Sequence, residues 1–198
     1  MRAEREIDTD AALVVIDVQR GFEEEAYWGT RNNPAADGNI AGLIDAWQAS
    51  GRPVVFVRHD SLKPDSPLRA GQPGNGFQGY VEERRGRGSG PELLLTKSVN
   101  SAFYGTPDLR EWLDRSGIRQ FVVAGVQTNM CAETTARMGG NLGYEVFFAL
   151  DATYTFGLTG PYGWVLGADE LARATAVSLH GGGFAKVVSS AELIAAAG

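Results

Sequence analysis

The sequence predicts an α/β fold with three αβα layers around a doubly wound, mostly parallel sheet of six strands. Short apolar runs rich in β-branched residues recur along the chain and are hydrophobic almost throughout, as in strands buried on both faces of a sheet. Helical patterns fall between most of these runs, which is typical of right-handed βαβ units. The length of 198 residues suits one domain over 1–198.

Six apolar runs are the predicted strands. In chain order they cover 11–16, 53–57, 93–95, 121–126, 146–150 and 185–188. Each is short and lacks strict polar alternation, so each fits the interior of a parallel sheet better than a sheet with one face in water.

Amphipathic patterns predict the helices. The first, over 39–50, places Ile40, Leu43, Ile44 and Trp47 on one face, and Gly51 follows as a C-terminal cap. Further helices are predicted over 107–116, 131–142 and 168–179.

Residues 60–92 show no apolar period and are rich in Gly, Pro and Arg. A long stretch of this kind inside a compact domain is usually functional, so we expect a lid or flap; a disordered insertion is the alternative. The sequence shows neither an internal repeat nor an interdomain linker.

Composition excludes several classes of protein. The net charge of −6 argues against nucleic-acid binding, and the chain has one cysteine, so it cannot form an internal disulfide. No apolar run approaches the ~20 residues of a membrane span, and the charged N-terminus does not resemble a signal peptide. We therefore expect a cytoplasmic protein without nucleic-acid or membrane partners.

Lysine is scarce in the chain. There are three lysines, Lys63, Lys97 and Lys186, against fifteen arginines.

Three reactive side chains directly follow predicted strands. They are Asp17 after the first strand, Lys97 after the third and Cys131 after the fourth. Ligands of open α/β sheets bind beyond the carboxyl ends of the strands, so we expect these groups at one rim. Lys97 and the first turn of the helix would lower the pKa of the Cys131 thiol, and Asp17 could act as general base and then acid. Taken singly, each has a structural alternative. Asp17 could cap the next helix, Lys97 could be a solvated surface lysine, and Cys131 could be a small apolar residue of the core.

The motifs around these residues resemble the isochorismatase-like cysteine hydrolases. That superfamily includes isochorismatases, nicotinamidases, N-carbamoylsarcosine amidase and streptothricin hydrolase. The matching segments are ALVVIDVQRGF at 12–22, PVVFVRHDS at 53–61, TKSVNSAFYGTPDLREWL at 96–113, FVVAGVQTNMCAETTARMGGNLGYEV at 121–146 and DAT at 151–153. The stretch YWGTRNNP at 27–34 resembles a subgroup with streptothricin-hydrolase-like amidases.

The resemblance implies the isochorismatase-like hydrolase fold and roles for individual residues. It implies Asp17 as base, Cys131 as nucleophile and Lys97 as the cation that tunes both. It also implies a cis peptide bond between Val126 and Gln127, with the N–H groups of Gln127 and Cys131 forming an oxyanion hole. Dimers or tetramers are common in the family, so we expect a homo-oligomer.

One departure from the family concerns metals. Family nicotinamidases bind a metal through an Asp and several histidines after the second strand. Here that region offers only His59, followed by Asp60, and no further histidine occurs before position 180. We therefore expect no metal and no cofactor, and His59 either lines the pocket mouth or is structural.

Substrate contacts are predicted for residues in or beside the rim loops. Aromatic side chains there could wall a small organic substrate, and the acidic run 23–25 could attract a cationic one. The predicted contact residues are Phe22, Trp28, His59, Phe103, Thr128 and Asn129.

These observations predict a hydrolase of a C–N bond in a small amide, lactam or carbamoyl compound, acting through a cysteine thioester. One alternative is vinyl-ether hydrolysis of the isochorismatase type, with Asp17 as the acid. The other is a catalytically silent α/β binding protein, although the sequence D-V-Q-R-G-F after the first strand lacks a nucleotide-binding glycine motif.

Overall fold

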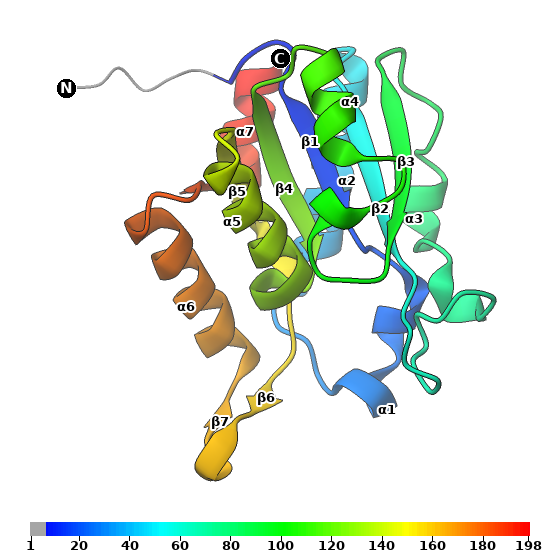
Figure 1. The fold of residues 1–198 in the computed structure, drawn as a ribbon, viewed down its shortest axis with the longest axis vertical. Helices are drawn as coiled ribbons and strands as arrows, with labels where there is room; N and C mark the ends of the chain where they lie inside the picture. Colours follow the sequence, from blue (N-terminus) through cyan, green and yellow to red (C-terminus); the bar gives the residue numbers. More distant parts are fainter. Residues whose placement is uncertain (1–6) are drawn as a thin grey trace.

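The computed structural model describes residues 7–198 and contains the six predicted strands in one parallel sheet (Figure 1). The strand order is β3-β2-β1-β4-β5-β8, so the chain starts in the middle of the sheet and extends it in both directions. The strands are β1 (Ala12–Ile16), β2 (Val54–His59), β3 (Glu92–Lys97), β4 (Gln120–Val126), β5 (Glu145–Tyr154) and β8 (Lys186–Val188). The predicted doubly wound α/β fold is confirmed.

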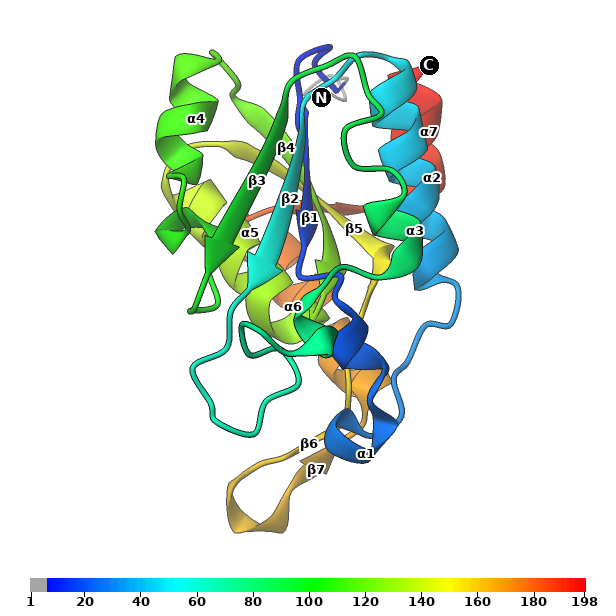
Figure 2. The ribbon, with the colours of Figure 1, turned by 90° about the vertical axis from the view of Figure 1, so that its right-hand side faces the viewer.

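Helices cover both faces of the sheet (Figure 2). One face carries α2 (Ala36–Ala49), α3 (Gly79–Glu82) and α7 (Ser190–Ala197); the other carries α4 (Leu109–Arg115), α5 (Glu133–Asn141) and α6 (Ala168–Gly181).

Each face of the sheet has its own hydrophobic core. In β1, Leu13 and Val15 belong to the cluster under α2, whereas Val14 and Ile16 belong to the cluster under α4 and α5. Successive side chains of a strand point to opposite faces, so a strand between two cores must be apolar at every position. This explains the uninterrupted hydrophobic runs in the sequence.

The structure also contains elements that the sequence patterns did not predict. A short hairpin of β6 (Leu158–Thr159) and β7 (Val165–Leu166) projects from the end of the molecule near α1 (Glu25–Trp28). Helix α7 begins after Ser189, whose hydroxyl accepts from the backbone of Glu192 while the Glu192 carboxylate accepts from the backbone N–H of Ser189. This capping box was a readable signal for α7. Short 3-10 turns cover Arg20–Glu23, Pro73–Asn75, Ala102–Tyr104 and Pro161–Gly163.

The segment 60–92 is folded and divides into two parts. Its second part contains α3 and packs beside α2, where Arg84 forms two hydrogen bonds of 2.7 and 2.9 Å with Asp45. Only its first part, around 61–68, lines the main cavity of the described chain. The region available for a lid is therefore shorter than the sequence suggested.

No helix within residues 7–198 is long and apolar enough to cross a membrane.

Candidate active site

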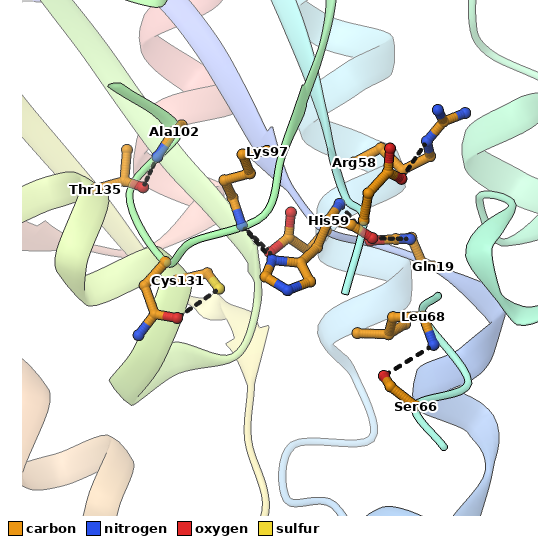
Figure 3. A network of polar contacts seen from close by, with 12 residues as sticks. Gln19, Arg58, His59, Ser66, Leu68, Lys97, Ala102, Cys131 and Thr135 are labelled. Carbon is orange, nitrogen blue, oxygen red and sulfur yellow. Dashed lines mark hydrogen bonds and ion pairs between the residues drawn. The ribbon is translucent and has the colours of Figure 1, made fainter. Parts of the chain in front are cut away.

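The order of the strands brings Asp17, Lys97 and Cys131 to one corner of the molecule, where Figure 3 labels Lys97, Cys131 and the neighbouring His59. Asp17 directly follows β1 with a φ of 52°, and Lys97 is the last residue of β3. Cys131 lies in a π-helical turn, Thr128–Ala132, between β4 and α5. Because β1 pairs with β4 on one side and β2 on the other, the ends of these strands adjoin. The register pairs Lys97 with His59 at the end of β2, which adds a fourth polar group.

Lys97 and Asp17 form a buried ion pair. The Nζ atom of Lys97 lies 2.6 Å from Oδ2 of Asp17, and neither side chain is exposed to solvent. The same Nζ lies 3.1 Å from Nδ1 of His59. Burial alone would lower the pKa of Lys97, but the nearby Asp17 and Cys131 outweigh this effect and raise it. Lys97 is therefore an ammonium ion at neutral pH.

One carboxylate oxygen of Asp17 accepts no hydrogen bond from the described residues. While Oδ2 accepts from Lys97, the buried Oδ1 has no hydrogen-bond partner among the described residues. A carboxylate oxygen of Asp17, a ring nitrogen of His59 and Sγ of Cys131 all lie within 4.8 Å of one another. A buried acceptor without a donor is costly unless a proton or ligand arrives to satisfy it.

The surroundings of the Cys131 thiol favour its neutral, protonated form. Burial and the negative charge of Asp17 raise its pKa well above the ordinary value, and Lys97 only partly counteracts them. The prediction of a lowered thiol pKa is thus wrong. The sequence patterns carry no information on how deeply the thiol is buried, nor on the ion pair of 2.6 Å in which the charge of Asp17 largely neutralises that of Lys97. Sγ makes a long contact of 3.8 Å to Oδ1 of Asn100.

His59 is neutral and accepts a hydrogen bond from Lys97. Burial is the main cause that lowers its pKa, and the Lys97 ammonium contributes. An ammonium can only donate, so Nδ1 of His59 must be the acceptor and Nε2 carries the ring proton.

The side chain of Gln19 fixes the end of β2. Its Oε1 accepts from the backbone N–H of His59 at 2.8 Å, and its Nε2 donates to the carbonyls of His59 and Asn75 at 3.0 and 2.8 Å. The Asn75 amide in turn donates to the carbonyl of Leu68 at 2.8 Å. Gln19 therefore connects the reactive corner to the loop that lines the cavity. It stands two residues after Asp17 in the segment ALVVIDVQRGF, and its position after a strand was the available signal.

A cavity of about 860 Å³ opens onto this corner. Asp17, His59, Gln127 and Cys131 line it at the end of the sheet. The Val126–Gln127 peptide bond is cis, at the position that the resemblance implied. The volume is within the range of sites for small organic ligands.

A model of the isochorismatase domain matches residues 11–188 of the chain. The chain belongs to the isochorismatase family. The isochorismatase family protein YrdC of Bacillus subtilis is 34% identical over 92% of this chain and 94% of its own length. Nicotinamidase 3 of Arabidopsis thaliana is 35% identical over 92% of this chain and 86% of its own.

A solved structure supports the same assignment. An isochorismatase-family protein from Chromobacterium violaceum superposes with a TM-score of 0.89 at 39% identity, covering 100% of this chain and 98% of that one. The streptothricin hydrolase of Streptomyces noursei is also similar, at 28% identity over 73% of this chain and 50% of its own length. Members of the family are hydrolases, and the chain is a hydrolase of this family.

The donor atoms near the thiol do not suit a metal ion. Asp17, His59 and Cys131 form the one group of three acidic, His or Cys donors within the described residues that could hold a cation. However, the Lys97 ammonium already occupies the space between Asp17 and His59. A cation there would face a buried like charge about 3 Å from its ligands, which electrostatics strongly disfavours.

The predicted substrate contacts divide into two groups. Phe22, Trp28 and His59 line the cavity. Phe103 does not, because it packs in the core against Phe121 and Tyr144, with ring centroids 6.0 and 5.9 Å away.

Thr128 and Asn129 also lie outside the cavity lining. Their side chains turn toward β5 and the residue after it: Thr128 donates to the hydroxyl of Thr153 at 2.9 Å, and Asn129 accepts from Thr155. Both side chains thus connect the π-helical turn to Thr153 and Thr155.

Several cavity residues were missed by the sequence patterns. Four of them stand in segments that carry the family resemblance, at positions 61, 98, 100 and 130, and the other eight stand outside every motif that the sequence analysis used. The missed residues are Ser61, Leu62, Lys63, Pro64, Ser66, Leu68, Ser98, Asn100, Met130, Phe156, Gly157 and Leu158.

Proposed function

We propose that this chain hydrolyses a C–N bond of a small amide, lactam or carbamoyl compound through a thioester on Cys131. One observation carries the proposal: a protonated thiol and a carboxylate with an unpartnered buried oxygen lie within 4.8 Å of one another at the base of a cavity. The pair can exchange a proton, which is the requirement for a neutral thiol to become a nucleophile.

In the first step the sulfur of Cys131 attacks the carbonyl carbon of the amide while its proton passes to the carboxylate of Asp17. The Lys97 ammonium stays bound to Asp17 and offsets the negative charge that develops nearby. The thiol does not need to ionise before the substrate arrives, so its raised pKa is compatible with attack.

The negative oxygen of the tetrahedral intermediate needs donors. Both Gln127 and Cys131 line the cavity, and we assign their backbone N–H groups to this role. Losing one such donor typically costs about 3 kcal/mol of transition-state stabilisation.

In the remaining steps Asp17 returns its proton to the departing nitrogen, and the C–N bond breaks to leave a thioester. Asp17 then removes a proton from water, which attacks the thioester and releases a carboxylic acid. The proton finally returns to the Cys131 sulfur. The sum is amide plus water giving acid plus amine, and no cofactor takes part.

The name of a relative favours an amide over a vinyl ether. Nicotinamidase 3, 35% identical to this chain, is named for a substrate with a primary amide. The two reactions differ in one respect that can be measured, because vinyl-ether hydrolysis needs Asp17 as an acid but forms no bond to Cys131.

A panel of primary amides, lactams and N-carbamoyl compounds, including nicotinamide and a streptothricin-type lactam, tests the proposal. We expect the chain to hydrolyse at least one of them and Cys131→Ala to lose at least about 10³-fold in kcat/KM. Hydrolysis of a vinyl ether such as isochorismate with Cys131→Ala fully active would overturn it.

A cytoplasmic location and a homo-oligomeric state remain part of the proposal. Cell fractionation tests the first, and light scattering on a size-exclusion column tests the second.

A further inference from the structure

The three lysines of the chain have different surroundings. Lys97 pairs with Asp17 at 2.6 Å, and Lys186 pairs with Glu145 at 3.0 Å. Lys63 has no ion-pair partner within residues 7–198, yet it lines the main cavity. A cation that faces a ligand cavity without a protein counter-ion is available to an anionic ligand.

The backbone of Lys63 is held on both sides. Its N–H donates to the hydroxyl of Ser61 at 3.3 Å, and its carbonyl accepts from the N–H of Ser66 at 3.2 Å. The loop is closed at its ends by a bond of 3.1 Å from the N–H of Ser61 to the carbonyl of Leu68. The buried Asn75 donates to the same Leu68 carbonyl. The stem of Lys63 therefore starts from a fixed point on the cavity wall.

The other charges of the cavity cancel. Asp17 is neutralised by Lys97, and the lowered pKa of His59 leaves its ring uncharged. No Glu or Arg belongs to the described cavity lining. Lys63 therefore gives the site a net positive charge.

The acidic run 23–25 does not offset this charge. Glu23 and Glu25 line a separate, smaller cavity together with Arg31 and Asp37. The two cavities share Phe22 and Phe156 as lining residues, so these rings stand between the acidic run and the main cavity. The attraction of a cationic substrate by the run 23–25 thus has no support from the geometry.

An aromatic wall lines the same cavity as Lys63 and gives it an apolar surface. The ring of Phe22 lies 4.8 Å from that of Trp28 and 6.2 Å from that of Phe156, and Trp28 lies 5.7 Å from Phe156. Tyr27 extends the wall toward solvent. A group of aromatic rings of this kind favours contact with a flat, apolar body.

The geometry points to a substrate that combines a planar unsaturated or aromatic body, a scissile amide at Cys131 and a carboxylate that pairs with Lys63. This inference rests on the proposed function for the amide, but the carboxylate subsite stands on the charges and the loop alone.

Binding to the inert Cys131→Ala variant tests the subsite without turnover. The probes are 4-carbamoylbenzoate and 6-carbamoyl-2-naphthoate, compared by calorimetry with their uncharged parents benzamide and 2-naphthamide. We expect at least one acid to bind about 10-fold more tightly than its parent, as a charged hydrogen bond in a partly enclosed site provides. Lys63→Gln should remove that preference, and Lys63→Glu should reverse it.

Arg69→Gln is the matched control. It removes one positive charge from the chain just beyond the same loop, but Arg69 does not line the cavity. The preference for the acids should survive in this variant. A preference that is absent, that persists in Lys63→Gln or that is lost equally in Arg69→Gln would overturn the inference, as would failure of all four probes to bind.

The two proposals fail separately. Because Cys131→Ala cannot form a thioester, an anion preference that depends on Lys63 would stand even if no amide were hydrolysed. Conversely, hydrolysis through Cys131 without an anion preference would leave the proposed function intact and remove only the carboxylate subsite.

Discussion

Two regions of the site are built in different ways: the reactive corner, formed by Asp17, His59, Lys97 and Cys131, and the cavity wall, formed by the loop 61–68 and the aromatic rings. Asp17, His59 and Lys97 sit at the ends of adjacent parallel strands, so the register of the sheet fixes their separation. The wall comes from the loop 61–68, the turn around α1 and the chain near Phe156, none of which belongs to the sheet. The proposed chemistry therefore depends on the ends of the sheet strands, whereas the proposed substrate contacts depend on loops that Gln19 connects to those strand ends.

The largest losses of stability and turnover are expected from breaking the ion pair between Asp17 and Lys97. In Asp17→Asn or Lys97→Met, a buried charge loses its partner, so each variant should lose about 3–5 kcal/mol of unfolding free energy and at least about 10³-fold in turnover. The double variant Asp17→Asn, Lys97→Met buries no charge and should regain most of the stability but none of the activity. Urea denaturation and kinetics on one substrate measure both. Additive losses of stability in the double variant would contradict the coupling of this pair.

A smaller effect, a fall of about 10²-fold in kcat, is expected from His59→Leu, because the variant removes the hydrogen-bond acceptor of Lys97.

The pKa of His59 is lowered by folding, so the unfolded chain binds the proton more readily than the folded chain. Stability should therefore fall as the pH drops below the ordinary value of about 6.5. His59→Asn places an uncharged acceptor near the position of Nδ1 and should keep most of the activity while weakening this acid dependence. An unchanged acid limb in His59→Asn would assign the titration to another group.

The link between corner and wall is tested by Gln19→Leu. The variant leaves the N–H of His59 and the carbonyl of Asn75 without partners, which should cost about 1–3 kcal/mol of stability. Because the loop 61–68 is held through Asn75, we expect KM to rise about 10-fold together with a smaller fall in kcat. Gln19→Glu retains an acceptor for His59 and serves as the partial-rescue control. A change in kcat alone would show that Gln19 acts only on the corner.

The smallest effect is expected within the wall. Trp28→Ala should raise KM about 5-fold with kcat nearly unchanged, because the ring contacts the body of the substrate and not the reacting atoms. Trp28→Phe keeps a ring but removes the hydrogen bond of 2.8 Å to the carbonyl of Gly21, so it separates stacking from loop anchoring. A loss of kcat as large as that in His59→Leu would abolish the distinction between the two regions.

The same division explains what the sequence could predict. Strand runs and the residues that follow them are readable because each strand end has a defined place in a parallel sheet, so Asp17, Lys97 and Cys131 could be placed at one rim. Thr128 and Asn129 adjoin Cys131 in the sequence, but a π-helical turn directs their side chains toward Thr153 and Thr155, and no regular period predicts that direction.

Electrostatics was the other limit of the sequence patterns. They placed a lysine near the thiol but gave no measure of burial, and it is burial, followed by the charge of Asp17, that determines the direction of the thiol pKa. The contribution of Phe156 and of the loop 61–68 to the cavity likewise depends on tertiary packing between segments far apart in the chain.

Intact-protein mass spectrometry of the enzyme, quenched in acid during turnover of a hydrolysable amide, tests the role of Cys131 most directly. We predict a population heavier by the acyl group, with the added mass on the peptide that contains Cys131, and its absence in Cys131→Ala. Turnover without any acyl adduct, or an adduct on a residue other than Cys131, would contradict the thioester mechanism.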